Sequence, residues 1–330
     1  MTEVILEVKR LRVEIGEGEG VVTPVDDVSF AITPGETLGL VGESGSGKSM
    51  TLRALLGLLP PGGRVANGEL LFRSTDGTLR NYSPEEIRGR EISMVFQEPM
   101  AALNPVMRVE TLLAEAQRAH GDGSEGVRAR SLELLREVGM PDPQRQLRAH
   151  PHELSGGLRQ RVMIAMALAT DCAVLLCDEP TTALDVTIQD QVLRLIDRLR
   201  REHNMAVVFV THDLAVIGQL CDRVAVLYAG RVVESGPVDD VFTSPAHPYT
   251  LGLIRSVPEL ERRTNRLESI GGQPPDPRSF PSGCRFHPRC FMAQSDCVSC
   301  SHVQLDAGEG RATACIHHGE LPSVASGAVE

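Results

Sequence analysis

Residues 42–49 combine glycines, a lysine and a serine in an arrangement suited to binding phosphate groups. The run matches the pattern GxxxxGK(S/T), in which the glycines let backbone N–H groups surround phosphate oxygens. Lys48 is expected to neutralise the β- and γ-phosphates of a nucleotide, and the Ser49 hydroxyl to ligate Mg²⁺. The pattern therefore predicts a site for ATP with Mg²⁺. It consists of Gly42, Glu43, Ser44, Gly45, Ser46, Gly47, Lys48 and Ser49.

Two acidic residues, Asp178 and Glu179, directly follow the apolar run 173–177, which is typical of a buried strand. Because ligands of parallel sheets bind outside the carboxyl ends of the strands, both carboxylates are expected beside the phosphate loop. Asp178 would hold Mg²⁺ through its water shell, and Glu179 would be the general base that polarises the attacking water. Gln97 and His212 also follow apolar runs. Gln97 is expected to complete the Mg²⁺ shell, and His212 to contact the γ-phosphate.

The elements that must position these groups alternate along the chain between apolar strands and helices. The phosphate loop follows a strand and opens a helix, whose N-terminus adds partial positive charge. Strands are expected at 4–15, 27–41, 69–73, 92–96, 174–177, 206–210 and 223–228. Helices are expected at 49–59, within 108–139, after Ser155, at 188–201 and at 214–220. Such alternation predicts an α/β fold in which helices cover a parallel sheet.

Composition narrows the class of protein further. Of the 330 residues, 42% are apolar, 3% are aromatic and none is Trp, which suits an aliphatic α/β core. The formal net charge of -11 disfavours binding to the phosphate backbone of nucleic acid. No apolar run approaches the roughly 20 residues of a membrane-spanning helix, and the first residues lack the layout of a secretory signal. We expect a soluble cytosolic protein that serves a membrane only by docking to other chains.

The segment 154–161, Leu-Ser-Gly-Gly-Leu-Arg-Gln-Arg, is the most distinctive of the chain. Its serine is expected to cap the helix that follows, and its glycines to expose N–H groups as a second anion site. The segment resembles the LSGGQ-type signature of ATP-binding-cassette (ABC) ATPases. That resemblance implies that two cassettes pair head to tail, each signature covering the ATP held by the other. The residues expected at this contact are Ser155, Gly156, Gly157 and Gln160.

The resemblance covers about residues 1–258 and implies a P-loop NTPase core with a β-rich N-terminal subdomain and a helical subdomain at about 98–165. Gln97 matches the Q-loop of the family, 183–185 its D-loop, and His212 its switch histidine. The chain departs from the family in two places. Leu158 stands where many signatures carry Gln, and no aromatic residue occurs from Leu11 to Ser29, where many cassettes supply a ring that stacks on adenine.

Three further stretches resemble the ATPases of dipeptide and oligopeptide importers, with nickel importers close behind: 97–105, 247–258 and 272–290. The resemblance implies a motor subunit at the cytoplasmic face of the membrane that couples ATP hydrolysis to the uptake of short peptides. Its partners would be a second ATPase, identical or a sister chain, two transmembrane permease subunits and an extracytoplasmic substrate-binding protein. The alternatives are a nickel or metal-chelate importer and, in a different class, a non-transport ABC ATPase that acts on nucleic acid.

Beyond about residue 259 the chain becomes rich in Pro, Gly and Cys, and we expect a separate extension at 259–330. Five cysteines lie between Cys284 and Cys315, and in a cytosolic chain such a cluster indicates metal more than disulfides. The expected ligands are Cys284, Cys290, Cys297 and Cys315.

Four thiolates suffice for a [4Fe–4S] cluster or a Zn²⁺ site, and five reduced cysteines without metal remain the other alternative. Cys300, His287 or His302 could replace one ligand. The resemblance to peptide-importer tails that hold an iron–sulfur cluster favours iron.

Overall fold

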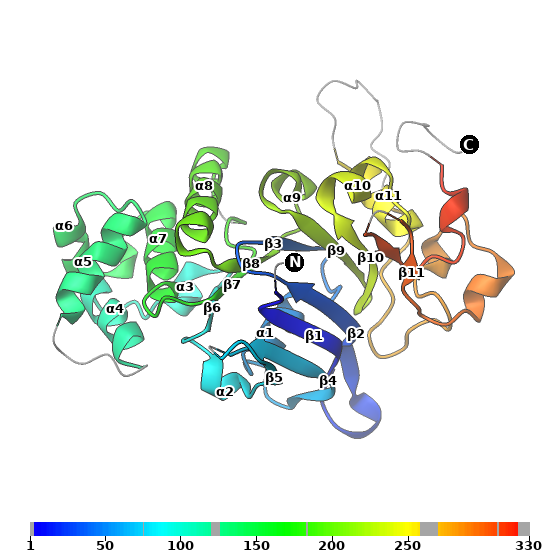
Figure 1. Cartoon of the computed structure of the whole chain (residues 1–330), viewed down its shortest axis with the longest axis horizontal. Coiled ribbons are helices and arrows are strands. Elements are labelled where there is room, and N and C mark those ends of the chain that lie inside the picture. Colours follow the sequence, from blue (N-terminus) through cyan, green and yellow to red (C-terminus); the bar gives the residue numbers. More distant parts are fainter. Residues whose placement is uncertain are drawn as a thin grey trace. The chain divides into compact units, whose positions relative to one another are not determined.

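A computed structural model describes residues 3–74, 76–119, 126–182, 184–257, 270–308 and 310–322. The chain falls into two compact units, each described by itself below (Figure 1). Unit 1 comprises residues 1–6, 32–36 and 72–209, and unit 2 comprises residues 7–31, 37–71 and 210–330. Unit 2 thus contains both the phosphate loop and the cysteine-rich extension. The boundary expected near 259 lies outside the described residues.

Unit 1 contains a parallel part of the sheet in which β6 and β7 pair in register from Ile92↔Val174 to Val95↔Cys177. The strand β8 follows β7 in the sheet order. Every residue of β6, β7 and β8 is buried, as expected for parallel strands covered on both faces. The strands assigned to this unit are β5 (Leu79–Asn81), β6 (Ile92–Val95), β7 (Val174–Asp178) and β8 (Ala206–Val210).

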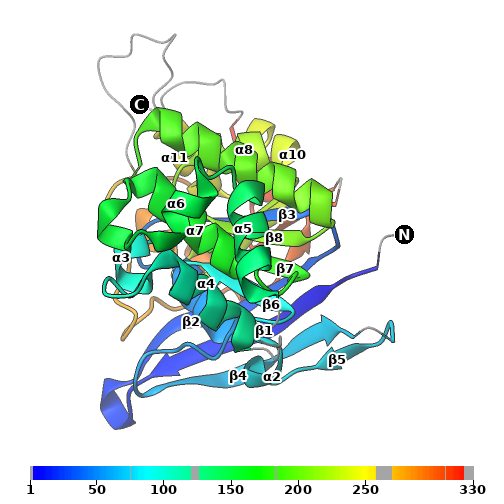
Figure 2. The same ribbon diagram turned by 90° about the vertical axis from the view of Figure 1, so that its left-hand side faces the viewer.

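The helices of unit 1 gather mainly around α7, which contacts α3, α4, α5 and α8 (Figure 2). A buried hydrogen bond of 2.9 Å from Gln117 Nε2 to Ser131 Oγ joins α4 to α5. Helix within 108–139, broken near its middle, was expected, and α4 and α5 agree with that expectation. The helices are α2 (Pro84–Ile87), α3 (Pro99–Ala102), α4 (Val109–Arg118), α5 (Val127–Glu137), α6 (Pro143–Arg148), α7 (Gly156–Ala167) and α8 (Val186–His203).

Unit 2 carries a mixed part of the sheet. The strand β3 pairs parallel with β9, β9 antiparallel with β10, and β12 antiparallel with both β10 and β11. A second sheet has the order β2-β1-β4 within this unit. The strands are β1 (Leu6–Ile15), β2 (Val22–Ile32), β3 (Thr37–Val41), β4 (Gly63–Arg73), β9 (Arg223–Tyr228), β10 (Arg231–Pro237), β11 (Leu305–Asp306) and β12 (Ala312–Thr313). The helices are α1 (Lys48–Leu55), α9 (Leu214–Leu220), α10 (Val238–Thr243) and α11 (Pro248–Arg255).

The single strand expected over 27–41 is wrong, because β2 ends at Ile32 and β3 begins at Thr37. Pro34 and Gly35 form the intervening turn, in which the Glu36 N–H donates to the Thr33 carbonyl at 3.1 Å. Gly35 has φ +75°, a conformation that favours glycine. The segment 27–41 therefore contains a turn. The Val, Ile and Leu residues on both sides of it gave the segment the composition of a single strand.

Three aromatic rings tie the extension into the core of unit 2. Tyr228, Tyr249 and Phe286 are all buried, and their ring centroids lie 4.6–5.4 Å apart. Phe286 comes from the extension, which otherwise contains short elements: the 3₁₀ turns η3 (His287–Arg289), η4 (Ser295–Val298) and η5 (His318–Glu320) and the strands β11 and β12. The extended loop expected at 271–283 contains neither helix nor strand. Among the described residues, no helix is long and apolar enough to cross a membrane.

Candidate functional site

The phosphate loop of unit 2 is shaped by glycines that no other residue could replace without displacing neighbours. A Cβ on Gly42, which has φ +149°, would lie 2.1 Å from the Leu227 carbonyl oxygen. A Cβ on Gly47, which has φ +105°, would lie 2.5 Å from the Pro24 carbonyl oxygen. The loop is therefore packed directly against the main chain of β2 and β9, which fixes its path.

Lys48, the first residue of α1, extends back into this loop. Its side chain is buried, and Nζ donates to the carbonyl oxygens of Gly42 at 2.8 Å and Glu43 at 3.0 Å. Ser49 follows as a half-buried residue on the first turn of the same helix. The structure thus brings together the whole predicted run 42–49, with an ammonium group and a helix N-terminus at one place.

The second predicted group lies in unit 1, at the carboxyl end of β7. Asp178 is 2% exposed and ends the strand, whereas Glu179 is half-buried. Glu179 Oε2 accepts hydrogen bonds from Thr182 Oγ1 at 2.8 Å and from Gln97 Nε2 at 3.3 Å. The structure therefore joins Gln97 to the predicted base. Thr182 was not predicted from the sequence. Its position three residues after Glu179 nevertheless allows its hydroxyl to reach back to the Glu179 carboxylate.

Glu179 also has an unusual main-chain conformation. Its φ is +45°, in the left-handed region that costs a residue with a Cβ about 1 kcal/mol or more. Pro180 follows it and disfavours the right-handed helical region at the preceding residue. Such strain concentrates at functional sites, where surrounding structure holds a side chain in a required direction.

His212 lies in unit 2, one residue after Thr211, whose N–H donates to the Leu40 carbonyl at 3.4 Å. It is exposed and follows the end of β8. Leu40 belongs to β3, the strand that leads into the phosphate loop. Unit 2 therefore contains both the phosphate loop and the predicted switch histidine, and unit 1 contains Gln97 and the two carboxylates.

The signature segment is only partly as expected. Ser155 is exposed at the N-cap position of α7, but its side chain makes no capping hydrogen bond, which corrects the expected cap. Gly156 is exposed beside it. Gly157 is buried, and a Cβ there would lie 2.6 Å from Ile188 Cγ2 of α8. In the D-loop, Leu184 lies beside Gly156, and Ala183 is outside the described residues.

Gln160, the fourth residue expected at this contact, is buried in the isolated chain. Its side chain is 1% exposed, and within the described part of the chain its Nε2 has no hydrogen-bond partner. A contact between Gln160 and the nucleotide of another subunit stays a prediction. The helix α7 is buried on most of its surface, since Val162, Met163, Ile164 and Ala165 are buried as well.

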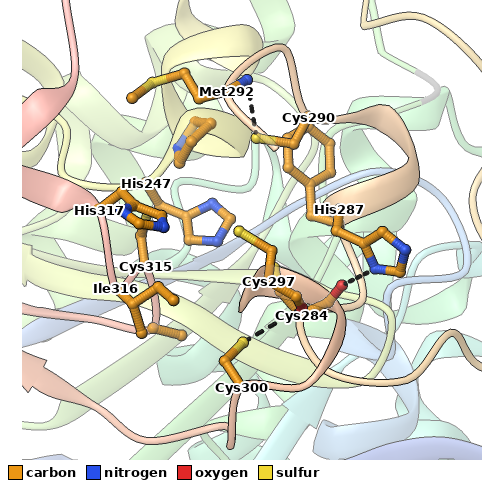
Figure 3. Close-up of a pocket in the computed structure, with 13 residues that line it drawn as sticks. His247, Cys284, His287, Cys290, Met292, Cys297, Cys300, Cys315, Ile316 and His317 are labelled. Carbon is orange, nitrogen blue, oxygen red and sulfur yellow. Dashed lines mark hydrogen bonds between the residues drawn. The ribbon is translucent and has the colours of Figure 1, made fainter. Parts of the chain in front are cut away.

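The five cysteines of the extension surround one pocket of unit 2 (Figure 3). The Cys290 sulfur accepts a hydrogen bond from the Met292 N–H at 3.4 Å, and the Cys300 thiol donates to the Cys297 carbonyl at 3.4 Å. Of the other three cysteines, Cys172 and Cys177 are buried in unit 1, and Cys221 is half-buried in unit 2. The pocket is lined by His247, Pro248, Cys284, Phe286, His287, Cys290, Met292, Cys297, Cys300, Ala314, Cys315, Ile316 and His317.

Burial governs the charge of the groups around this pocket. It raises the pKa of the Cys290 thiol to about 11 and that of the Cys315 thiol to about 12. It lowers the pKa of His247 to about 3, and His247 Nδ1 accepts a hydrogen bond from the Tyr249 N–H at 3.1 Å. The thiols of Cys290 and Cys315 and the imidazole of His247 are therefore neutral at pH 7 unless a cation is bound.

Side chains can share one metal ion only where their ligand atoms lie close to one another. Among the described residues, two groups have all their ligand atoms within 4.8 Å of one another: His150, His152 and Glu153, and Asp296, Cys297 and His317. No three of the pocket's sulfur atoms meet that limit. The four predicted ligands nevertheless lie near one another, since negative charge on Cys284, Cys290 or Cys297 would raise the pKa of the Cys315 thiol. Negative charge on Cys300 would likewise raise the pKa of the Cys284 thiol.

Comparison with known proteins gives a consistent result along the chain. Residues 25–182 match the family model described as ABC transporter, and residues 233–297 match the model of the oligopeptide/dipeptide transporter C-terminal region. A putative peptide import ATP-binding protein of Brucella abortus is 45% identical over 95% of this chain and 95% of its own length. The oligopeptide transport ATP-binding protein OppD of Escherichia coli is 44% identical over 95% of this chain and 93% of its own.

Solved structures resemble the fold as well. The dimeric bacterial ABC transporter cassette MJ0796 has a TM-score of 0.60 and 29% sequence identity. The match covers 71% of this chain and 99% of that one. A second structure of the same cassette is described as a dimeric post-hydrolysis state bound to ADP and Pi, and it matches equally well.

Proposed function

Because the chain belongs to the ABC transporter family, among the ATP-binding proteins of peptide importers, we propose that it drives the uptake of short peptides across the cytoplasmic membrane. It is an ATPase of the ABC type. The observation that carries the proposal is the pairing of an intact phosphate loop with a C-terminal region of the peptide-transporter kind. The nickel and nucleic-acid alternatives are not favoured, since the relatives are named for peptide import.

The roles proposed for individual residues follow from their positions. Residues 42–49 would surround the phosphates, with the buried Lys48 as the counter-charge to the β- and γ-phosphates. Ser49, Gln97 and Asp178 offer the oxygen ligands that suit Mg²⁺ and its waters. Glu179 would polarise the attacking water, and its contacts with Thr182 and Gln97 support that role by orienting its carboxylate. We assign to His212 a contact with the γ-phosphate.

Hydrolysis in this family is coupled to transport through other subunits. Membership in the family implies a partner ATPase and transmembrane permeases. We propose that Ser155, Gly156 and Gly157 cover the partner's ATP, and that the exposure of Ser155 and Gly156 leaves them available for this contact. The helical part of unit 1, from α3 to α7, would contact the permeases at the cytoplasmic face of the membrane. An extracytoplasmic binding protein would deliver the peptide.

Transport by a reconstituted complex tests the proposal. The complex of this chain with its second ATPase, permeases and binding protein is placed in vesicles, and uptake of a labelled tripeptide and of a nickel chelate is measured with ATP. We expect peptide uptake that needs ATP and is lost in Lys48→Ala, because the phosphates lose their counter-charge. Uptake of the nickel chelate without uptake of the peptide would show that the cargo is the chelate. A complex that hydrolyses no ATP would contradict the proposal as a whole.

For the cysteine pocket we propose a [4Fe–4S] cluster bound by Cys284, Cys290, Cys297 and Cys315. The donor set fits, because four cysteines from one segment surround a single pocket. A tetrahedral Zn²⁺ with bonds of about 2.3 Å to the same four thiolates is the alternative. A four-iron cluster instead takes one thiolate at each of four irons. Bound there, it would act as a structural staple for a segment that contains little regular structure.

Metal analysis of two matched variants tests this assignment. Anaerobically purified protein is expected to contain about four irons per chain and to absorb near about 400 nm, as such a cluster does. Cys315→Ser should lose the iron, because one of its four ligands is gone. Cys300→Ser should keep it, because Cys300 is the cysteine left outside the proposed set. Stoichiometric zinc without iron would assign the pocket to zinc, and the absence of both metals would refute a metal site.

A further inference from the structure

Glu43, the second residue of the phosphate loop, is held from three directions by unit 2. Its carbonyl oxygen accepts from Lys48 Nζ at 3.0 Å, and its N–H donates to Tyr249 Oη at 2.8 Å. Its carboxylate accepts from both terminal nitrogens of Arg289, at 2.7 Å from Nη1 and 3.0 Å from Nη2. Glu43 therefore contacts both Lys48, the predicted phosphate-binding lysine, and an arginine of the extension, 246 positions further along the chain.

Arg289 is itself fixed on all sides. Its side chain is 5% exposed, and Nε donates to the Gly271 carbonyl at 2.8 Å. Nη1 also donates to Tyr228 Oη at 3.3 Å, and the guanidinium lies 5.7 Å from the centroid of that ring. A planar guanidinium with so many partners has little freedom, so it presents its two terminal nitrogens to Glu43 in one orientation.

The contact between Arg289 and Glu43 differs from that of Arg285, another cationic anchor of the extension. Arg285 stacks on Phe280 at 3.6 Å and pairs with Asp26 of β2, outside the phosphate loop. Arg289 binds a residue of the loop itself. Without Arg289, the partly buried Glu43 carboxylate would be an uncompensated negative charge beside a loop that must accept an anionic triphosphate.

We propose that Arg289 is a positioning residue of the nucleotide site, acting through Glu43 on the main chain that holds Lys48. The inference rests on the proposed function, since it presumes that residues 42–49 bind ATP. It assigns the cysteine-rich extension a part in nucleotide binding, because Arg289 belongs to the 3₁₀ turn that precedes Cys290. The phosphate loop needs Arg289 for tight ATP binding because the Glu43 carboxylate carries a negative charge that Arg289 neutralises.

A double-mutant cycle with nucleotide affinity as the readout tests this dependence. In the full-length chain, Arg289→Gln is expected to raise the Kd for ATP about tenfold or more, because the partly buried Glu43 carboxylate loses its partner. Glu43→Gln in the Arg289→Gln background should bring the Kd back to within about threefold of the parent, because the unpaired charge is gone. Arg289→Lys should lie between, since it keeps the charge and loses the fork. In the assembled transporter the KM for ATP should rise more than kcat falls.

Arg311→Gln is the matched control. Arg311 also anchors the extension, through a hydrogen bond to the Ser244 carbonyl, which lies outside the phosphate loop. Its Kd for ATP should equal that of the parent chain. Equal losses of ATP affinity in Arg311→Gln and Arg289→Gln, or additive effects of Arg289→Gln and Glu43→Gln on the Kd, would overturn the inference. Arg289 would then serve only to hold the extension against the rest of unit 2.

Two further outcomes are informative. An unchanged Kd in Arg289→Gln, with ATP bound normally by the parent chain, refutes the inference while leaving the proposed function intact. A parent chain that binds no ATP refutes the proposed function first. Should Arg289→Gln not fold, as judged by its circular dichroism, the Arg289→Lys variant still decides. It must raise the Kd if the arginine fork compensates the Glu43 carboxylate, and an unchanged Kd in Arg289→Lys overturns the inference.

Discussion

Replacing Glu179 by Gln is expected to leave ATP binding intact while lowering ATP turnover by about 10²- to 10⁴-fold, the usual contribution of a general base. Gln preserves the size of the side chain and can still accept from Thr182 Oγ1, but it cannot take a proton from water. The measurement is steady-state ATP hydrolysis by the assembled transporter, together with ATP binding by the chain alone. Bound ATP should also hold the cassette dimer closed, which size-exclusion chromatography detects.

Thr182→Val provides a graded control for that experiment. It removes one of the hydrogen bonds that orient Glu179 and leaves the carboxylate in place. Turnover should therefore fall only severalfold, within the range of a single lost hydrogen bond. Hydrolysis by Glu179→Gln at close to the normal rate would exclude Glu179 as the base, and equal losses in the two variants would indicate that orientation matters more than proton transfer.

Replacing Ser155 by Arg is expected to abolish ATP-driven dimerisation without weakening the variant's own nucleotide binding. The residue is exposed at the start of α7 and belongs to unit 1, whereas the phosphate loop belongs to unit 2. A long cationic side chain would fill the surface that must accept the γ-phosphate of the partner's ATP. Dimer formation is measured in the Glu179→Gln background, in which ATP is not consumed.

The control for this prediction is Ser155→Ala, which removes the hydroxyl without adding bulk. Since the Ser155 hydroxyl makes no capping hydrogen bond, α7 should be as stable in Ser155→Ala as in the parent chain. If Ser155→Arg lost its own ATP binding, the signature would act within one chain and the proposed dimer contact would be wrong.

The sequence predicted the local structure around the candidate site, because that structure depends on short-range rules. A GxxxxGK(S/T) run between a strand and a helix specifies its own backbone, and the apolar run before Asp178 and Glu179 forms the strand β7, which ends at Asp178. The strands β6, β8 and β9 were likewise marked by continuous apolar residues. The splitting of 27–41 at Pro34 and Gly35 was missed because the apolar residues on both sides outweighed the turn signal.

The parts that could not be predicted depend on contacts between distant residues. No local pattern relates Glu43 to Arg289, and the pairing becomes visible only once Tyr228, Tyr249 and Phe286 form one core. The left-handed φ of Glu179 likewise depends on the surrounding structure rather than on its residue type. The burial of Gln160 also depends on the surrounding structure, since its polar residue type gives no sign of it.

The pairing of β12 with β10 also bears on how the molecule avoids aggregation. Glu234 and Ser235 of β10 lie opposite Thr313 and Ala312, and the Ala314 N–H donates to the Val233 carbonyl at 2.8 Å. β12 thus covers part of β10, whose N–H and C=O groups would otherwise form an open sheet edge. Such an edge is a template for pairing with other chains. We therefore expect residues 312–314 to protect this part of β10 from pairing with strands of other chains, an effect independent of any metal or nucleotide.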